Sequence, residues 1–147
     1  MNSQKLVLAA ADAEDLETIS ARLQDAVAQV KDLVYLPKSR RFAALFNRFR
    51  WESAGVRSGT RVRAGLHIDG VLSARASKLR RGNPDAVASL LAIRFHPNGG
   101  EDPGGIIELI FSGDGILRLE VECIDAELAD LSGDWAARGR PVHEFES

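Results

Sequence analysis

Apolar and polar residues alternate with a period of two over most of the chain after residue 32, in short runs separated by glycine and proline. The clearest run is 61–68, where the even-numbered residues are apolar and the odd-numbered residues are polar or glycine. Successive side chains of a strand point to opposite faces, so this pattern predicts strands with one buried and one wet face. A chain built this way is constrained to a largely antiparallel sheet.

The predicted strands cover residues 5–9, 33–36, 41–52, 61–68, 71–76 and 91–95, followed by a hairpin over 105–123. In the long strand over 41–52, Phe42, Ala44 and Phe46 share one phase, whereas Phe49 and Trp51 have the other. A strand cannot change faces without an irregularity. We therefore expect a bulge or bend near Asn47, with Phe49 and Trp51 facing the core. Between these strands we expect a loop over 53–60, a polar loop over 78–85 and a helical turn over 86–89.

The register of the last hairpin can be argued from its side chains. Two-residue loops at 113–114 or 114–115 place Arg118 on the same face as an apolar partner. A three-residue loop over 113–115 instead gives six apolar residues one buried face, with Gly115 in the left-handed position. Its pairs are Phe111 with Leu117, Leu109 with Leu119, and Ile107 with Val121. The same register sets Glu108 against Glu120, with Arg94 as the nearest cation to neutralise them.

Helices are expected at both ends of this sheet. Asp12 resembles an N-cap, and Leu16, Ile19 and Leu23 recur at helical spacing, which predicts a helix over 13–28. Asp125 is expected to cap a short C-terminal helix through residue 131. The fold class is therefore α+β: a strongly bent antiparallel sheet or partial barrel of about six to seven strands, with one N-terminal and one short C-terminal helix. A meander closed by a C-terminal helix is a pleckstrin-homology-like arrangement.

The 147 residues suit one domain, which we place at 1–134, with a polar tail at 135–147. The N-terminus lacks the basic region and the length of a secretory signal, and no stretch reaches the ~20 apolar residues of a membrane helix. The single cysteine, Cys123, fits a reducing compartment. A cytoplasmic protein with no membrane span is expected.

Positive charge is concentrated between Lys38 and Arg81. This segment holds twelve Lys or Arg and two acids, a net charge of +10, whereas the rest of the chain carries −12. Within it, Arg48 and Arg50 share a face of one predicted strand, and Arg61 and Arg63 share the outward face of the next. If the strands are antiparallel neighbours, the four guanidinium groups form one row. Arginine favours bidentate contact with phosphate or carboxylate, so the row is a candidate anion-binding face.

The alternative to an anion-binding face is a solvated sheet face, because the same arginines can pair with Glu108, Glu120 and Glu122 of their own sheet. Nucleic acid is disfavoured as the partner. Phe49 and Trp51 would be stacking residues for bases, but alternation places them opposite the arginines, and the net charge is −2. An acidic protein or a small anionic ligand is the partner that the sequence favours.

No other motif indicates chemistry. His67, His96 and His143 lack metal-ligand spacing, and we read His67 as a solvated surface residue and His96 as a loop residue. Cys123 is in phase with Val121 and is expected to be buried and inert. The glycines of 96–105 surround two acids, which repel phosphate, so this stretch is expected to be a mobile connection. No catalytic residue, metal ligand or cofactor is predicted.

Several strings span most of the chain and have family-specific wording: LQDAV (23–27), YLPKSRRF (35–42), NRFRWE (47–52), LLAIRF (90–95) and VECI (121–124). In them the chain resembles an uncharacterised alphaproteobacterial family, domain-of-unknown-function family 2948. Relatives tend to have an acid before the tryptophan, where this chain has Arg50. That difference changes the charge of the central strand surface. The resemblance implies a whole domain but no activity, because none is established for the family.

The leading functional hypothesis is a small, non-enzymatic binding or adaptor domain that contacts an anionic partner through Arg48, Arg50, Arg61 and Arg63. The alternative is a structural self-association module, a homo-oligomer in which the basic segment of one copy meets an acidic face of another. An enzyme of unknown class is the third hypothesis.

Overall fold

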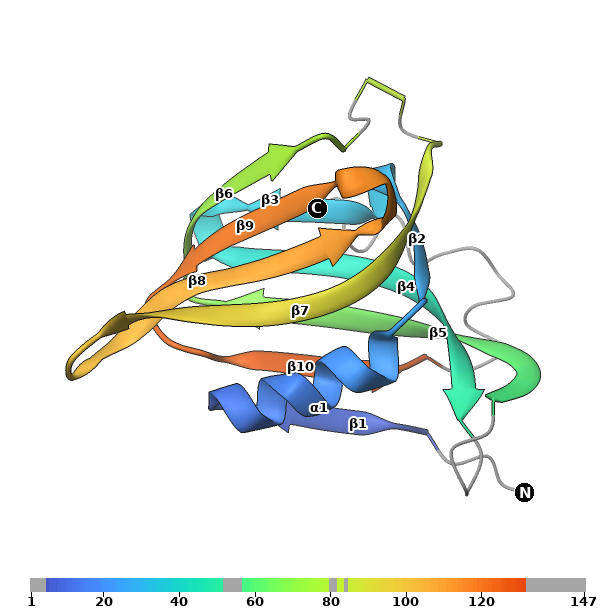
Figure 1. The fold of residues 1–147 in the computed structure, drawn as a ribbon, viewed down its shortest axis with the longest axis horizontal. Coiled ribbons are helices and arrows are strands. Elements are labelled where there is room, and N and C mark those ends of the chain that lie inside the picture. The colour runs from blue at the N-terminus through green and yellow to red at the C-terminus, as the bar shows by residue number, and fades with distance from the viewer. Residues whose placement is uncertain (1–4, 52–56, 80–81, 84, 132–147) are drawn as a thin grey trace.

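The computed structural model describes residues 5–51, 57–79, 82–83 and 85–131. Figure 1 shows a curved sheet with one α-helix, α1 (Ala13–Leu23), packed against it. Short 3-10 turns occur at η1 (Val30–Asp32), η2 (Pro37–Ser39) and η4 (Ser112–Asp114). The strands are β1 (Val7–Ala10), β2 (Val27–Gln29), β3 (Leu33–Leu36), β4 (Arg41–Trp51), β5 (Arg57–Asp69), β6 (Val71–Ser77), β7 (Val87–Gly99), β8 (Asp102–Phe111), β9 (Ile116–Val121) and β10 (Ala126–Asp130).

These strands form one sheet in the order β1-β10-β5-β4-β2-β7-β8-β9-β6, with β3 added beside β4. All recorded pairings are antiparallel, and the sheet bends so that β6, β9, β8 and β7 lie in front of β4 and β5 (Figure 1). The sheet does not close, because its end strands β1 and β6 each pair on one side only within the described residues. The strongly bent antiparallel sheet with an N-terminal helix is confirmed, but ten strands replace the six to seven expected.

The core lies between the two layers of the bent sheet. Phe42 and Phe46 of β4 and Phe111 of β8 are at most 1% exposed. Truncating one such phenylalanine to alanine typically costs about 3–5 kcal/mol. The inward sets are those that alternation predicted for β5, β8 and β9: Ala64, Leu66, Ile68, Ile107, Leu109, Phe111, Leu117, Leu119 and Val121.

Helix α1 begins where predicted and ends early. The side chain of Asp12 accepts a hydrogen bond from the Asp15 amide at 2.8 Å, and Leu16, Ile19 and Leu23 are buried. The helix stops at Leu23 rather than at residue 28. Asp25 takes a left-handed backbone (φ 68°), and its amide donates to Leu90 O of β7 at 2.8 Å. The next residues then pair with β7 as β2, so a tertiary hydrogen-bonding partner overrides the continuing helical pattern.

Strand β4 keeps one phase along most of its length. Its register with β5 runs without interruption from Arg41 opposite Asp69 to Phe49 opposite Arg61, and shifts only between Phe49 and Trp51. The predicted position of the bulge, near Asn47, is therefore wrong, because the irregularity lies a few residues further along β4. Because no irregularity precedes it, Phe49 lies on the face opposite Phe46 and not in the core.

The β8–β9 hairpin has the predicted buried face but a different register. Leu109 pairs with Leu117, Ile107 with Leu119, and Gly105 with Val121, so β9 is displaced by two residues from the expected register. Residues 112–115 connect the two strands, and the left-handed positions are Gly113 and Asp114 rather than Gly115. A two-residue shift preserves which side chains face inward.

Strand β7 is far longer than the segment predicted for it. The expected helical turn over 86–89 lies mostly in β7, and the expected mobile connection over 96–105 is the far end of the β7–β8 hairpin. Pro97 is tolerated because β2 pairs with β7 only as far as Ser89, so that no described strand pairs with that edge of β7 at Pro97. Gly105 allows close strand contact, since a Cβ there would lie 2.3 Å from His96 O.

The predicted C-terminal helix is wrong. Residues 126–130 form β10, which inserts between β1 and β5 and pairs with both. The segment has helix-forming residues, but two neighbouring strand edges supply hydrogen-bond partners for its backbone. The pleckstrin-homology-like arrangement loses its support, because its closing helix was assigned to this segment. The predicted tail over 135–147 lies outside the described residues.

Candidate functional site

The outer face of the front layer carries an ordered array of polar side chains. Four side chains face one another across the strands in the order β6, β9, β8, β7: Arg75, Arg118, Glu108 and Arg94. Two residues along each strand, a second row follows in the same order: Ser73, Glu120, Ile106 and His96. These are the outward partners of the buried residues of β8 and β9, so the alternation that builds the core also builds this array.

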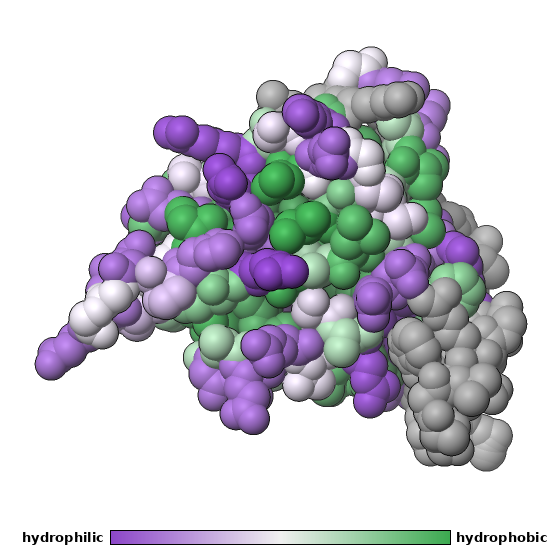
Figure 2. Space-filling model, in the orientation of Figure 1, coloured by the Kyte–Doolittle hydropathy of each residue, from purple (hydrophilic) through white to green (hydrophobic). Residues whose placement is uncertain are grey.

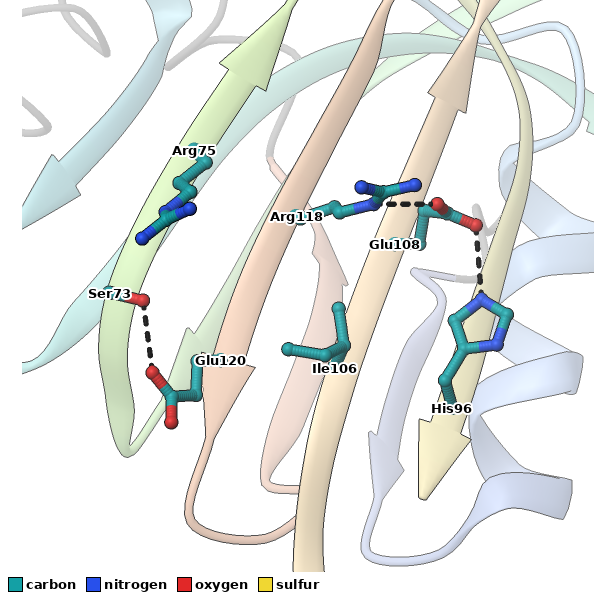
Figure 3. A pocket seen from close by; sticks show the side chains of 7 residues that line it. All are labelled: Ser73, Arg75, His96, Ile106, Glu108, Arg118 and Glu120. Carbon is teal, nitrogen blue, oxygen red and sulfur yellow. Dashed lines mark hydrogen bonds and ion pairs between the residues drawn. The ribbon is translucent and has the colours of Figure 1, made fainter. Parts of the chain in front are cut away.

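Part of the array surrounds a hollow of about 510 Å³, which we call the arginine hollow (Figure 3). Its lining residues are Ser73, Arg75, His96, Ile106, Glu108, Arg118 and Glu120. The volume falls within the ~300–1,000 Å³ typical of small-molecule sites. Figure 2 shows the same face, where apolar residues gather in the middle between polar ones.

Glu108 is the best-anchored residue of the arginine hollow. Its side chain is 11% exposed; Oε1 lies 3.1 Å from Nε2 of His96, and Oε2 accepts a hydrogen bond from Nε of Arg118 at 3.0 Å. The hydrogen bond with His96 lowers the pKa of Glu108, burial opposes this shift, and the bond from Arg118 lowers the pKa further. Glu108 therefore stays ionised and fixes the positions of two cationic or donor side chains.

Arg75 differs from Arg118 in having no acidic partner among the residues that the structure describes. Arg118 uses Nε for Glu108, whereas Arg75 forms no hydrogen bond or ion pair with another residue that the structure describes. Ser73 donates to Oε1 of Glu120 at 3.2 Å, so Glu120 contacts β6 through a serine rather than through Arg75. Two arginines directly opposite on neighbouring strands repel each other by roughly 0.2–1 kcal/mol. An anion between them would relieve that repulsion.

Among the described residues that line the arginine hollow, the serine and the histidine do not form a pair of the kind that nucleophilic catalysis uses. Ser73 is on β6 and His96 on β7, three strand spacings apart, or about 14 Å. Within the described residues, no group of three His, Cys, Asp or Glu side chains is placed to hold a metal ion. What the described residues of the hollow present to solvent is therefore a pair of arginine donors beside two carboxylates.

The four arginines predicted from the sequence are not brought together in one row. Arg48 is in phase with Phe46 and points inward, whereas Arg61 and Arg63 lie opposite Phe49 and Asn47 on the other face. The side chain of Arg50 lies outside the described part of the structure. The expectation of one common face is wrong, because it assumed that β4 changes phase near Asn47.

Arg48 is part of a buried ion pair. It and Asp130 are 4% and 5% exposed, and their side chains form two hydrogen bonds of 2.9 and 2.7 Å. Arg48 also donates to Phe49 O, and Asp130 accepts from the Leu6 amide of the β1 end. The pair ties β4 to β10 and the first strand. The in-phase pattern of Phe42, Ala44 and Phe46 was the sequence signal that Arg48 faces inward.

Arg61 remains exposed, and its guanidinium carbon lies 4.3 Å from the centroid of the Phe49 ring. The ring takes up a cation–π contact on the outer face instead of filling the core. Arg63 is half-buried on the same face. Of the predicted row, these two residues form a pair on the outer face of β5.

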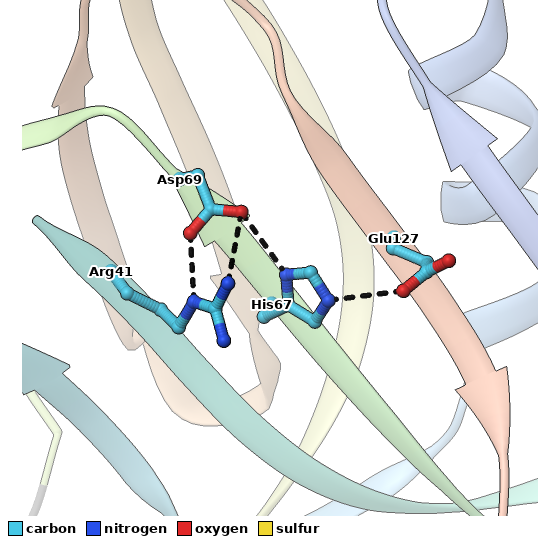
Figure 4. A network of polar contacts seen from close by, with 4 residues as sticks. All are labelled: Arg41, His67, Asp69 and Glu127. Carbon is cyan, nitrogen blue, oxygen red and sulfur yellow. Dashed lines mark hydrogen bonds and ion pairs between the residues drawn. The ribbon is translucent and has the colours of Figure 1, made fainter. Parts of the chain in front are cut away.

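A second polar cluster, the His67 network, lies on the outer face of β4, β5 and β10 (Figure 4). Arg41 binds both carboxylate oxygens of Asp69, at 2.7 and 3.4 Å. Nε2 of His67 lies 3.1 Å from Glu127, and Nδ1 lies 3.4 Å from Asp69 without a hydrogen bond of good geometry. His67 is outward, as predicted, but it is bound by acids rather than simply solvated.

Two other sequence predictions are wrong, and one lies outside the described residues. Cys123 is exposed, because β9 ends at Val121 and the alternating phase ends with it. His96 is a strand residue of β7 rather than a loop residue. His143 belongs to the part of the chain that the structure does not describe. Within the described part, no helix has the length and apolar character needed to cross a membrane.

The residues of the arginine hollow were missed because they meet through register. Arg75 was counted only as part of the charge block, and Glu108 was paired with Glu120. The available signal was charge complementarity: a register shifted by two residues replaces a Glu–Glu pair with Glu108–Arg118 and keeps the same buried face.

Comparison with known proteins identifies a family. The model of the family described as protein of unknown function (DUF2948) matches residues 6–143, and the chain belongs to this family. No curated protein and no solved structure shows significant similarity to the chain.

Proposed function

We propose, for this member of a family of unknown function, that the protein is a binding domain for a small organic anion held in the arginine hollow. The observation that carries the proposal is the exposed Arg75, which has no acidic partner in the described part of the chain and lies directly across from Arg118 in a hollow of about 510 Å³. Guanidinium groups are the donors best suited to carboxylate and phosphate. The hypothesis of a basic strand face is thus kept, but the face is moved to the front layer.

The contacts around Arg118 favour binding over simple solvation. Glu108 holds Arg118 through Nε, which leaves the terminal nitrogens of the guanidinium as donors. Because Glu108 is itself held by His96, Arg118 is pre-oriented before a ligand arrives. Pre-orientation lowers the entropy lost on binding.

A second anion-binding surface is proposed on Arg61 and Arg63, where the sequence first suggested one. Its support is the exposed Arg61 held over Phe49 and the position of Arg63 on the same face. This surface suits an acidic protein segment rather than a small molecule. It ranks second because its arginines are not across from each other on neighbouring strands, as Arg75 and Arg118 are.

The test of the first proposal is a titration with acetate, followed by the backbone amide signals in NMR spectra. We expect the largest shifts at Arg75, Arg118 and their strand neighbours, and no such shifts with ammonium. In the double variant Arg75→Gln, Arg118→Gln, affinity should fall about tenfold or more, because charge-assisted hydrogen bonds of about 1.5–3 kcal/mol each are lost.

The matched control is Arg22→Gln, Lys38→Gln, which removes the same formal charge from exposed sites on α1 and η2. It should bind acetate like the wild type. Equal weakening in both double variants, or acetate shifts centred away from β6 and β9, would overturn the proposal. Shifts centred on Arg61 and Arg63 would support the second surface instead.

A further inference from the structure

The charge of the two polar rows limits the ligand to a low charge. Two arginines and two glutamates line the hollow, and Arg94, at the β7 end of the first row, brings the formal charge of the two rows to +1 with His96 neutral. Glu108 keeps its negative charge, because His96 and Arg118 are both bound to it. A monoanion neutralises this surface. A dianion would bring one negative charge more than the rows can compensate, and Glu108 and Glu120 would repel it.

A mainly apolar row adjoins the first polar row, that of Arg75 and Arg118, on the side away from Ile106. Two residues further along the strands, Ser77, Ile116, Ile110 and Ala92 face one another across β6, β9, β8 and β7. Ile110 and Ile116 are half-buried on this outer face, and Leu91, at the bulge of β7, is 46% exposed. Two residues of a strand span about 7 Å, so apolar surface begins within that distance of the arginines.

The outer face therefore offers a cationic centre with apolar surface on both sides. Figure 2 shows apolar residues among polar ones in the middle of this face. Ile106 lies in the second polar row, within the lining of the hollow, and the Ile110–Ile116 pair lies beyond the arginines. Inorganic ions would use only the cationic centre. A ligand with a carboxylate head and a hydrocarbon body would use both, since apolar burial adds to the charged contact.

We infer that the ligand is an amphipathic monocarboxylate. Its carboxylate lies between Arg75 and Arg118, and its hydrocarbon part lies on Ile110 and Ile116. This inference rests on the proposed function, because it assumes that Arg75 and Arg118 bind an anion. It adds a ligand class: an aliphatic or aromatic acid of single charge, and not a nucleotide, an inorganic phosphate or a polyanion.

The test is a titration of the full chain with a homologous series of linear acids: acetate, butanoate, hexanoate and octanoate. Affinity should rise about two- to fourfold for each added methylene, up to the length of the apolar row. Hexylamine should not bind, because it brings a positive charge to the arginines. Hexyl phosphate, which carries more charge on the same body, should bind more weakly than hexanoate.

The variant Ile110→Thr, Ile116→Thr keeps two β-branched residues at outward positions, so β9 and β8 should still pair. Acetate should bind it as it binds the wild type, while the gain in affinity with chain length should be lost. The control Val87→Thr, at an exposed position at the start of β7, should retain that gain.

The possible outcomes separate the inference from the proposed function. If acetate and octanoate bind equally well through Arg75 and Arg118, the hydrocarbon contact is refuted and anion binding stands. If hexyl phosphate binds more tightly than hexanoate, the single-charge argument is refuted. If no acid binds, both the proposed function and this inference fail.

Discussion

The arginine hollow and the His67 network are built from similar side chains on the outer face of the same bent sheet, but on different strands. Each joins three strands or more and has a histidine within 3.1 Å of a glutamate. In the His67 network, Arg41 and His67 both contact acids, and the acids are Asp69 and Glu127. The arginine hollow is lined by two arginines and two glutamates, and its Arg75 has no acidic partner in the described structure.

This difference separates a structural cluster from a candidate binding site. Where each cation already has an acid, a ligand must displace an existing contact before it binds. Where a cation is held near another cation without an acid, a ligand removes repulsion and gains contacts together. The residue types histidine, arginine and glutamate therefore do not by themselves indicate a binding site. What indicates one is whether each cation already has an acidic partner.

Among these ion pairs, the buried Arg48–Asp130 pair should contribute most to stability, because both charges are paired and shielded from water. The change Asp130→Asn removes the charge that neutralises Arg48, whose side chain is 4% exposed. We expect a loss of about 3–5 kcal/mol in the free energy of unfolding, since the guanidinium is left buried without a counter-charge. Urea denaturation measures this loss.

The control for that variant is Asp114→Asn, at an exposed left-handed loop position that asparagine tolerates well. Its stability should stay within about 0.5 kcal/mol of the wild type. A loss below about 1 kcal/mol for Asp130→Asn would mean that water reaches Arg48. The pair would then behave like an exposed ion pair rather than a buried one.

Glu108 should make a smaller contribution, which depends on pH. The change Glu108→Gln weakens the contacts with His96 and Arg118, whose side chains are 56% and 61% exposed and regain water. We expect a loss of about 1 kcal/mol near pH 7, measured by urea denaturation.

The pH dependence follows from the lowered pKa of Glu108. Its ordinary value is 4.5, and the folded protein holds its pKa below that value. The stabilisation is therefore present above about pH 4.5 and is lost as the pH falls through the folded pKa. The difference between wild type and Glu108→Gln should shrink in that acidic range. A difference that is constant from about pH 7 down to about pH 3 would assign the loss to packing rather than to charge.

Arg75 should contribute least to stability, and with the opposite sign. The change Arg75→Gln removes the repulsion from Arg118, so we expect stability to be unchanged or raised by up to about 0.5 kcal/mol without a ligand. In the His67 network, Arg41→Gln should lower stability by up to about 1 kcal/mol, because an ion pair with Asp69 is lost. Parallel thermal and urea denaturation of the two variants measures the contrast. Equal losses would remove the distinction between the two clusters.

Sequence reasoning was most successful where the relevant contacts are local. The Asp12 cap, the buried stripe of α1, and the inward phase of β5, β8 and β9 follow from spacing along the chain. It failed where a distant partner decided the outcome. Residues 126–130 read as a helix, but two strand edges accept them as β10, and the helix over 13–28 ends early because β7 binds the chain after Asp25.

The candidate site shows the same division. Alternation placed Glu108, Arg118 and Glu120 on an outer face before any fold was known, since successive side chains of a strand must point to opposite sides. It did not decide which of them meet. A shift of two residues leaves every side chain on its own face and replaces Glu120 with Arg118 as the neighbour of Glu108.

The sequence by itself thus determined the faces of the strands and the residues of the core, because these depend on the geometry of neighbouring residues. Tertiary structure alone decided the register, the insertion of β10 and the inward position of the Arg48–Asp130 pair. These features depend on segments far apart in the chain, whose pairing is chosen by total packing and charge rather than by local pattern. The arginine hollow belongs to the second group, because its neighbours are set across four strands.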